Sequence, residues 1–175
     1  MEEQLSASVQ ASLQAAISDR AAPRLVFSTE SEGNAWLLEM SNRLARKIPD
    51  STTRTELLRT IHYEASRAGL DPQIVLGLIQ VESNFRKFAV SPVGARGYMQ
   101  VMPFWTRVIG DGDPSKLFHM QTNLRFGCVI LRHYLEREQG DMFLALGRYN
   151  GSRGKPEYPN AVFASRRLWQ TAPGP

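Results

Sequence analysis

A glutamate lies on the apolar side of a predicted helix. The stretch IVLGLIQVESNF carries apolar residues at helical spacing, and Glu82 follows Leu78 by four residues and Val75 by seven, within the apolar arc. Removal from water disfavours a charged carboxylate, so we expect a raised pKa. A carboxyl group that stays protonated near neutral pH can give its proton to a leaving group. Helix geometry alone favours the alternative, a structural role in an ion pair or as an acceptor of loop amides.

The loop that follows this helix has the composition of a cleft wall. It reads SPVGARGYMQVMP, and its two glycines allow close backbone approach and positive φ. Gln100 then stands between Met99 and Met102. An amide and thioethers suit a carbohydrate, which needs hydrogen bonds together with apolar contact to its rings. The alternative for the two methionines is ordinary core filling.

Three sequence blocks in this order resemble a known family. VESNF around Glu82, the loop SPVGARGYMQVMP, and RYNG closely resemble the soluble lytic transglycosylases of bacteria, which belong to the lysozyme-like superfamily (glycoside hydrolase family 23). The resemblance covers roughly Leu57 to Asn160, which is most of the expected folded domain. It implies a single lysozyme-like helical domain and an enzyme that cleaves peptidoglycan.

The resemblance also implies roles for individual residues. Glu82 would be the single catalytic acid that later acts as base, and Ser83 would help to fix that helix end or the acid. The residues implied to bind the glycan are Ser83, Ser91, Gln100, Met102, Tyr149 and Asn150. The last two would come from the wall opposite the loop. The chain departs from the family pattern in two places: RYNGS replaces the frequent AYNAG, and FWTR follows the Met-Pro pair where Thr-Ala is frequent.

A second catalytic carboxylate is not evident, although most glycosidases use two. Asp111 and Asp113 read as part of an exposed turn, and Glu136 and Glu138 as a charged helix end. The acetamido group of the sugar can replace the second carboxylate by stabilising the anomeric carbon. The resemblance then implies that Glu82 protonates the oxygen between N-acetylmuramic acid (MurNAc) and N-acetylglucosamine (GlcNAc). Glu82 would next take a proton from the 6-hydroxyl and leave a 1,6-anhydroMurNAc end.

Three other functions stay open at this stage. A hydrolase of the same fold would cleave muramoyl bonds with water, and its products would be heavier by one molecule of water. A non-catalytic peptidoglycan binder, or a structural part of a wall-spanning machine, would have no need of Glu82, Gln100, Tyr149 and Asn150 together. A helical nucleic-acid binder is supported only by the length of the chain and its isoelectric point of about 9.5.

Helices must position these residues, because no convincing period-two alternation extends over a full strand. The Asp71-Pro72 pair predicts the start of the helix that carries Glu82. Other helices are predicted at residues 34–48 and at residues 53–69, the latter behind a Thr53–Glu56 capping box. The segment NLRFGCVILRHYLERE predicts a further helix that ends near Gly140, and Asp141 caps the next one. A last helix is predicted from about Pro159 through Trp169. We therefore expect a mainly α fold. Residues 1–33 would form an N-terminal arm or frayed helix, and residues 34–175 the lysozyme-like transglycosylase catalytic domain.

The composition fits one globular domain with a sizeable core. The 175 residues are 42% hydrophobic and 22% charged, with a formal net charge of +4. This basic balance fits an anionic partner such as an acidic cell-wall polymer without selecting it. The sequence has no zinc spacing and no phosphate-binding glycine loop, so we expect neither a metal nor another cofactor. The single Cys128 excludes an intrachain disulfide and is expected to pack as a small apolar residue.

The N-terminal sequence differs from a signal peptide, because it is acidic and no apolar segment follows. Since peptidoglycan lies outside the cytoplasmic membrane, we expect a periplasmic protein whose leader is absent from this chain. Association with the outer membrane, and export by a phage or a secretion system, stay open. The expected partners are the glycan strands of peptidoglycan and cell-wall or secretion machinery, not nucleic acid. We expect a monomer.

Overall fold

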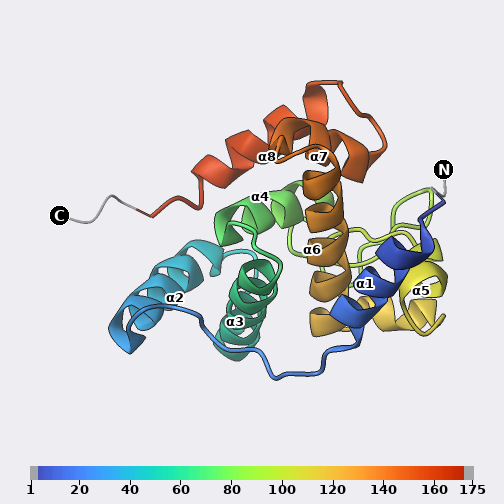
Figure 1. The fold of residues 1–175 in the computed structure, drawn as a ribbon. Coiled ribbons are helices and arrows are strands. Elements are labelled where there is room, and N and C mark those ends of the chain that lie inside the picture. Colours follow the sequence, from blue (N-terminus) through green and yellow to red (C-terminus); the bar gives the residue numbers. More distant parts are fainter. Residues whose placement is uncertain (1–3, 172–175) are drawn as a thin grey trace.

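Helices joined by loops make up the protein (Figure 1). The computed structural model describes residues 4–171, and within them two isolated bridges, Val90–Arg96 and Arg96–Val101, are the only β pairing. The elements are α1 (Ala7–Ser18), α2 (Glu30–Leu44), α3 (Ser51–Arg67), α4 (Pro72–Ser83), α5 (Phe104–Ile109), the 3₁₀ helix η1 (Pro114–Phe118), α6 (Met120–Arg137), α7 (Met142–Asn150) and α8 (Glu157–Arg167). The predicted mainly α fold class is confirmed.

Helix α4 carries Glu82 and forms part of the core. Pro72 is its first residue and Asp71 caps it by accepting the Gln73 N–H at 2.9 Å, as the sequence predicted. Every residue from Ile74 to Ile79 is buried, so the first half of the helix is buried all round and not on one side alone. The last turn is different, because there Glu82 is only half-buried. The carboxyl group therefore lies at the edge of the core.

Helices α4 and α8 approach closely at Gly77. A Cβ atom at this position would lie 2.8 Å from the backbone nitrogen of Arg166 and 2.9 Å from the carbonyl oxygen of Val162. Glycine permits this approach because it has no side chain. The two helices run in opposite directions, so the start of α8 lies beside the end of α4 and Tyr158 reaches Glu82.

The core is formed mainly by α2, α3, α4, α6 and the loop between α4 and α5, with fewer residues from α5, η1, α7 and α8. Within it, Arg125 of α6 and Glu64 of α3 form an ion pair of 2.9 Å with both side chains almost fully buried. Cys128 is also fully buried in α6, and burial together with the Glu64 charge raises the pKa of its thiol well above the usual range. Cys128 is therefore a packing residue, as expected from its apolar neighbours.

The start of α3 differs from the prediction. The helix begins at Ser51, because the carboxylate of Asp50 accepts the Thr53 N–H at 2.8 Å and also the Thr53 hydroxyl. The predicted capping box between Thr53 and Glu56 is therefore replaced by a cap that lies three residues earlier. The predicted Asp141 cap of α7 is confirmed, since its carboxylate accepts the Leu144 N–H at 3.1 Å.

Helix α2 also begins earlier than predicted, at Glu30, under a capping box formed by Thr29 and Glu32. The predicted arm at residues 1–33 therefore includes the first turn of α2. Residues 1–3 of that arm and residues 172–175 of the predicted domain lie outside the described part of the chain. Within residues 4–171, every helix is too short or too polar to cross a lipid bilayer.

Helix α1 docks on the body through partly buried apolar side chains, Leu13, Ala16 and Ile17, and through polar contacts. None of its residues is buried. The amide of Gln10 donates to the Val108 carbonyl of α5 at 2.9 Å, and Arg67 of α3 donates to the Ala16 carbonyl at 2.7 Å and pairs with Asp19 at 3.0 Å. Figure 1 shows α1 beside α5 and α6, followed by an extended segment that passes the end of α3 to reach α2. Residues 7–18 are thus a docked helix.

Candidate active site

Glu82 meets a tyrosine from the far end of the chain. The hydroxyl of Tyr158, in the first turn of α8, donates to Glu82 Oε1 at 2.5 Å. Two features of the fold create this contact: α4 ends directly after Glu82 and Ser83, and the antiparallel packing of α8 brings its first turn to that end. The carboxyl group is thereby fixed in orientation at the edge of the core.

Burial raises the pKa of Glu82 to about 7, and the hydrogen bond from Tyr158 offsets part of that rise. Burial and the neighbouring Glu82 charge raise the pKa of the Tyr158 hydroxyl well above its usual range, so this group keeps its proton and donates. The raised pKa agrees with the expectation from sequence. The structure therefore holds a carboxyl group that changes its charge near neutral pH.

Tyr149 of α7 lies on the same side of the core as Glu82. Its hydroxyl donates to the Met99 carbonyl in the loop between α4 and α5 at 2.7 Å. Burial raises the pKa of Tyr149 well above the usual range, and the Glu82 charge adds to the rise, which places this phenol within electrostatic reach of the carboxylate. Glu82, Tyr149 and Tyr158 thus come together from three helices.

Ser83 lies behind the end of α4 and is 1% exposed. Its hydroxyl oxygen is 2.7 Å from the Tyr98 carbonyl and 3.1 Å from the Ile79 carbonyl, so its one proton is shared between two acceptors or serves one of them. This contact ties the loop to the turn of helix that carries Glu82. The arrangement fits the expected role of fixing the helix end.

The loop between α4 and α5 turns back at once and closes on itself. Asn84 and Phe85 both have positive φ, at 51° and 63°, which ends the helix within two residues of Glu82. Gln100 also has positive φ, and its amide donates to the Ala89 and Gly97 carbonyls at 3.0 and 3.1 Å. The amide predicted to meet a sugar therefore also holds the loop together.

Three more of the predicted glycan-binding residues lie in or after this loop. The Ser91 hydroxyl accepts the Ala95 N–H at 3.0 Å and is half-buried. Met102 is half-buried and packs against the core. Asn150 is exposed at the end of α7, and its amide donates to the Ser152 hydroxyl at 2.7 Å. The structure shows no contact that joins these three residues to Glu82.

Asn123 of α6 anchors the loop and was not predicted from the sequence. The residue is 1% exposed. Its side-chain oxygen accepts the Met99 N–H at 2.9 Å, and its nitrogen donates to the Arg96 and Leu117 carbonyls, each at 2.8 Å. The loop comes so close that a Cβ atom on Gly97 would lie 2.4 Å from the Asn123 nitrogen. Asn123 thus fixes the backbone that carries Gln100.

The four carboxyl groups that were considered above as a second catalytic carboxylate form contacts within their own regions. Each is bound to a cation or to a backbone N–H of its own region. The contacts are Asp111 with Lys116, Asp113 with the Ser115 N–H, Glu136 with Arg132, and Glu138 with both Arg148 and Arg153. Glu138 is held by its two arginines, which lower its pKa to about 2. The pKa of Glu82 is raised, whereas the pKa values of Asp111, Asp113 and Glu138 are lowered.

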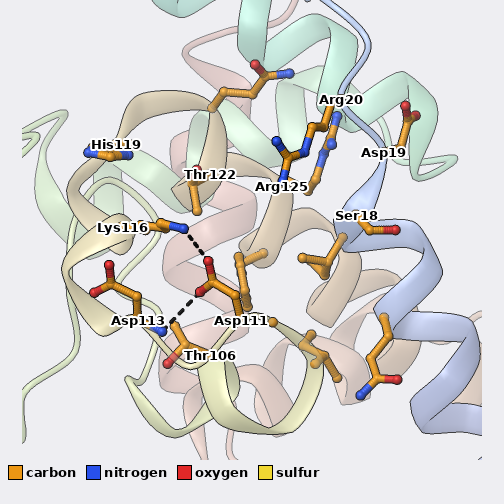
Figure 2. A pocket seen from close by; sticks show the side chains of 16 residues that line it. Ser18, Asp19, Arg20, Thr106, Asp111, Asp113, Lys116, His119, Thr122 and Arg125 are labelled. Carbon is orange, nitrogen blue, oxygen red and sulfur yellow. Dashed lines mark hydrogen bonds and ion pairs between the residues drawn. The ribbon is translucent and has the colours of Figure 1, made fainter.

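A cavity of about 590 Å³ lies between α1 and the surface formed by α5, η1 and α6 (Figure 2). Charged side chains surround it, and several are already paired: Figure 2 shows Lys116 against Asp111, and Arg125 is bound to buried Glu64. Neither Glu82 nor the predicted glycan-binding residues line this cavity. It is a gap beneath the docked arm, separate from the region around Glu82.

Known proteins match this chain over the same region. The family model of the transglycosylase SLT domain matches residues 59–162, more than half of the chain. A transglycosylase of Enterobacteria phage PRD1 is 31% identical over 123 residues, which cover 66% of this chain and 45% of the relative. The membrane-bound lytic murein transglycosylase C of Haemophilus influenzae (strain PittEE) is 44% identical over 112 residues, which cover 55% of this chain and 31% of the relative.

Among solved structures, the lytic transglycosylase Slt of Pseudomonas aeruginosa, in an inactive mutant, is similar to this chain. It is 22% identical, with a TM-score of 0.49, and the match covers 77% of this chain and 28% of that chain. This chain thus spans less than half the length of each of these three proteins.

Proposed function

The chain belongs to the transglycosylase SLT domain family, and on that premise we propose that it is a peptidoglycan lytic transglycosylase. It would cleave the MurNAc-β-1,4-GlcNAc bond without water and leave 1,6-anhydroMurNAc ends. The observation that carries this proposal is the Glu82 carboxyl group, with a pKa of about 7 and an orientation fixed by Tyr158. The relatives named transglycosylase support it.

In the first step Glu82 would act as general acid. Tyr158 donates to Oε1, which makes that oxygen the less basic one, so the proton belongs on Oε2. Oε2 would give this proton to the glycosidic oxygen as the bond to the MurNAc anomeric carbon breaks. The acetamido group of the same sugar would stabilise the positive charge that develops there.

In the second step the Glu82 carboxylate would act as base. It would take the proton of the MurNAc 6-hydroxyl while the oxygen of that hydroxyl bonds to the anomeric carbon. The carboxyl group regains its proton, no water is consumed, and the anhydro ring closes. A pKa of about 7 suits both steps, because a group that titrates near the working pH can donate and accept with little driving force lost.

The cleft would be formed by the loop between α4 and α5 on one side and by α7 and α8 on the other. In this arrangement Gln100, Ser91 and Met102 would meet the glycan from the loop, and Tyr149 and Asn150 from the opposite wall. Tyr149 bridges the two walls through its bond to Met99. Ser83 would act behind the acid, through the bond of its hydroxyl to the Tyr98 carbonyl.

We place the protein in the cell envelope, in the periplasm, because its proposed substrate lies there. Relatives named membrane-bound lytic murein transglycosylase support an envelope location. We expect it to act as a monomer on glycan strands, and a role within secretion or other wall-spanning machinery is compatible with this chemistry.

The experiment that tests this proposal is cleavage of purified peptidoglycan in water labelled with heavy oxygen. A lytic transglycosylase gives anhydro ends that carry no label. A muramidase-type hydrolase of the same fold gives reducing ends that carry one labelled oxygen. Release of labelled reducing ends would overturn the proposal, and release of no soluble product would move the protein to the peptidoglycan binders.

A further inference from the structure

Exposed apolar side chains gather on the loop between α4 and α5. Phe88, Val90 and Val93 are 70%, 59% and 76% exposed. They are three of the seven large apolar side chains that are exposed among the described residues, and the other four are scattered along the chain. Single exposed apolar residues are normal in soluble proteins, whereas a cluster of them marks an interaction surface.

Cationic residues lie in the same loop, and two of them stack on aromatic rings. Residues 86–96 include three cationic residues and no Asp or Glu. The Lys87 ammonium lies 5.4 Å from the centre of the Phe88 ring, and the Arg96 guanidinium lies 5.3 Å from that of Phe118, whose ring is 5.9 Å from the Phe88 ring. We use the term basic apolar patch for the following residues of the loop: Arg86, Lys87, Phe88, Val90, Val93 and Arg96.

Backbone hydrogen bonds hold the tip of this loop in place. The Gly94 N–H donates to the Ser91 carbonyl at 2.9 Å, which closes a turn with Pro92 in its second position. At the base of the turn, the Gly97 N–H donates to the Ala89 carbonyl at 2.8 Å. Val93 is therefore held at a fixed, projecting tip and does not fold back onto the core. Little ordering is needed when such a surface binds a partner.

We propose that the basic apolar patch docks the protein onto the surface of an anionic phospholipid bilayer. Phe88 and Val93 would enter the headgroup region while the cations of the patch contact lipid phosphates. Apolar tips combined with Lys and Arg form the composition that binds such interfaces. Each cation near an anionic leaflet strengthens binding by about fivefold, and the apolar contacts are needed in addition for stable attachment. The inference is independent of the proposed cleavage reaction.

Two other anionic partners fit the patch less well. Nucleic acid would use the cations and could stack a base on Phe88, but valines at a loop tip offer bases no flat surface. A glycan strand needs convergent hydrogen-bonding groups beside an apolar face, and the tip presents aliphatic side chains instead. Both remain as outcomes of the test below.

The test is co-sedimentation of the full chain with vesicles. One set of vesicles contains phosphatidylcholine alone, and the other contains phosphatidylglycerol in addition. We expect binding to the anionic vesicles that weakens as salt is added, and much weaker binding to the neutral ones. The Phe88→Ser/Val93→Ser variant should bind the anionic vesicles roughly tenfold or more weakly, because two apolar contacts are lost.

The matched control is the Leu38→Ser/Leu168→Ser variant. These two leucines are 65% and 62% exposed but lie in α2 and after α8, outside the patch. This variant should bind like the wild type. The Glu82→Gln variant should also bind like the wild type, so loss of catalysis and loss of docking are measured separately.

A Phe88→Trp variant reports insertion directly. The native tryptophans, Trp36, Trp105 and Trp169, are all buried at 6% exposure or less, so they give a nearly constant background. On anionic vesicles the new indole should shift its emission to the blue, and lipids that carry bromine in their acyl chains should quench it.

Three outcomes would overturn the proposal. The first is equal binding of the wild type and the Phe88→Ser/Val93→Ser variant to anionic vesicles. The second is an unshifted and unquenched Phe88→Trp emission. The third is patch-dependent binding to DNA or to intact peptidoglycan without binding to vesicles. Unchanged thermal unfolding of each variant shows that any loss of binding is not a loss of folding.

Discussion

At the scale of single residues, Glu82 holds the two properties that an acid–base catalyst needs. Its pKa of about 7 leaves both charge states populated near neutral pH, and Tyr158 fixes the carboxyl group through Oε1. Burial provides the first property and packing of α8 against α4 provides the second. The same burial makes ionisation unfavourable, so Glu82 also influences stability.

Stability should fall with rising pH because of this group. The pKa of Glu82 is about 7 in the folded protein, above the ordinary value of 4.5 that applies to the unfolded chain. The folded state therefore holds the proton more tightly than the unfolded state. Its stabilising effect is full below about pH 4.5 and is lost as pH rises through about 7. The side chain of the Glu82→Gln variant is neutral at every pH. As the pH rises from about 4.5 to about 7, the unfolding free energy of this variant should therefore rise by about 1–3 kcal/mol relative to that of the wild type. Denaturant unfolding across this range measures it, and a constant difference between the two proteins would contradict the pKa.

Tyr158 should set the position of the alkaline limb of the pH–rate profile. Its hydrogen bond lowers the pKa of Glu82, so the Tyr158→Phe variant should have a higher pKa there. Because the proposed first step needs protonated Glu82, the alkaline limb should move to higher pH. Turnover should fall roughly tenfold, because a hydrogen bond to a charged group is lost. The control is Tyr63→Phe, in α3. An unmoved limb in the Tyr158→Phe variant would mean that Glu82 is not the group that titrates.

At the scale of elements, the site depends on the loop between α4 and α5 and on the helix behind it. The loop has little regular structure, so its shape comes from side-chain anchors. Asn123 of α6 makes three hydrogen bonds to the loop and to the end of η1, and Ser83 of α4 holds the Tyr98 carbonyl. The position of Gln100 therefore follows from two almost fully buried side chains, Asn123 and Ser83, that hold the loop from the protein interior.

Removal of the Asn123 anchor should destabilise the protein and impair cleavage together. The Asn123→Ala variant leaves the Met99 N–H and the Arg96 and Leu117 carbonyls without their partner. We expect a loss of about 2–4 kcal/mol in unfolding free energy, since buried groups left unpaired are costly. Thr122→Ala, next in sequence and half-buried, is the control and should change stability by less than about 1 kcal/mol. Equal stability of the two variants would show that the loop is held by other contacts.

The sequence predicts elements whose signals are local and misses contacts made by packing. The Asp71-Pro72 and Asp141 caps are set by adjacent residues, and both are confirmed. The start of α3 is predicted wrongly because a stronger cap, Asp50, lies just upstream of Thr53. Tyr158 lies 76 residues from Glu82, and its contact depends on how α8 packs on α4, which no spacing reveals.

At the scale of the whole molecule, the chain is a helical body with a helix docked on its side. We propose that residues 34–175 form the catalytic domain and that residues 1–33 are an arm. The described part of the arm, residues 4–33, supplies none of the contacts given above for Glu82, and its docking leaves the cavity beneath α1 (Figure 2). The body contains the buried Arg125–Glu64 pair and the main core, so it should fold without α1.

Deletion of residues 1–20 tests this division. It removes α1 with its bonds to Val108 and Arg67 and the packing of Leu13 and Ile17 on the core, but it removes no fully buried residue. We expect the unfolding free energy to fall by about 1–3 kcal/mol, the range of ordinary local changes, with peptidoglycan cleavage retained. Thermal unfolding and release of soluble muropeptides measure the two effects. A truncated chain that does not fold would assign α1 to the core domain.

The most direct test of the central claim compares the wild type with two variants on purified peptidoglycan. Glu82→Gln removes the proposed acid, and Glu136→Gln, at an exposed glutamate of α6, is the matched control. Mass spectrometry of the soluble products should find anhydromuropeptides from the wild type and Glu136→Gln, and at least a 10²–10⁴-fold lower yield from Glu82→Gln. Near-normal release of anhydromuropeptides by Glu82→Gln would contradict the account.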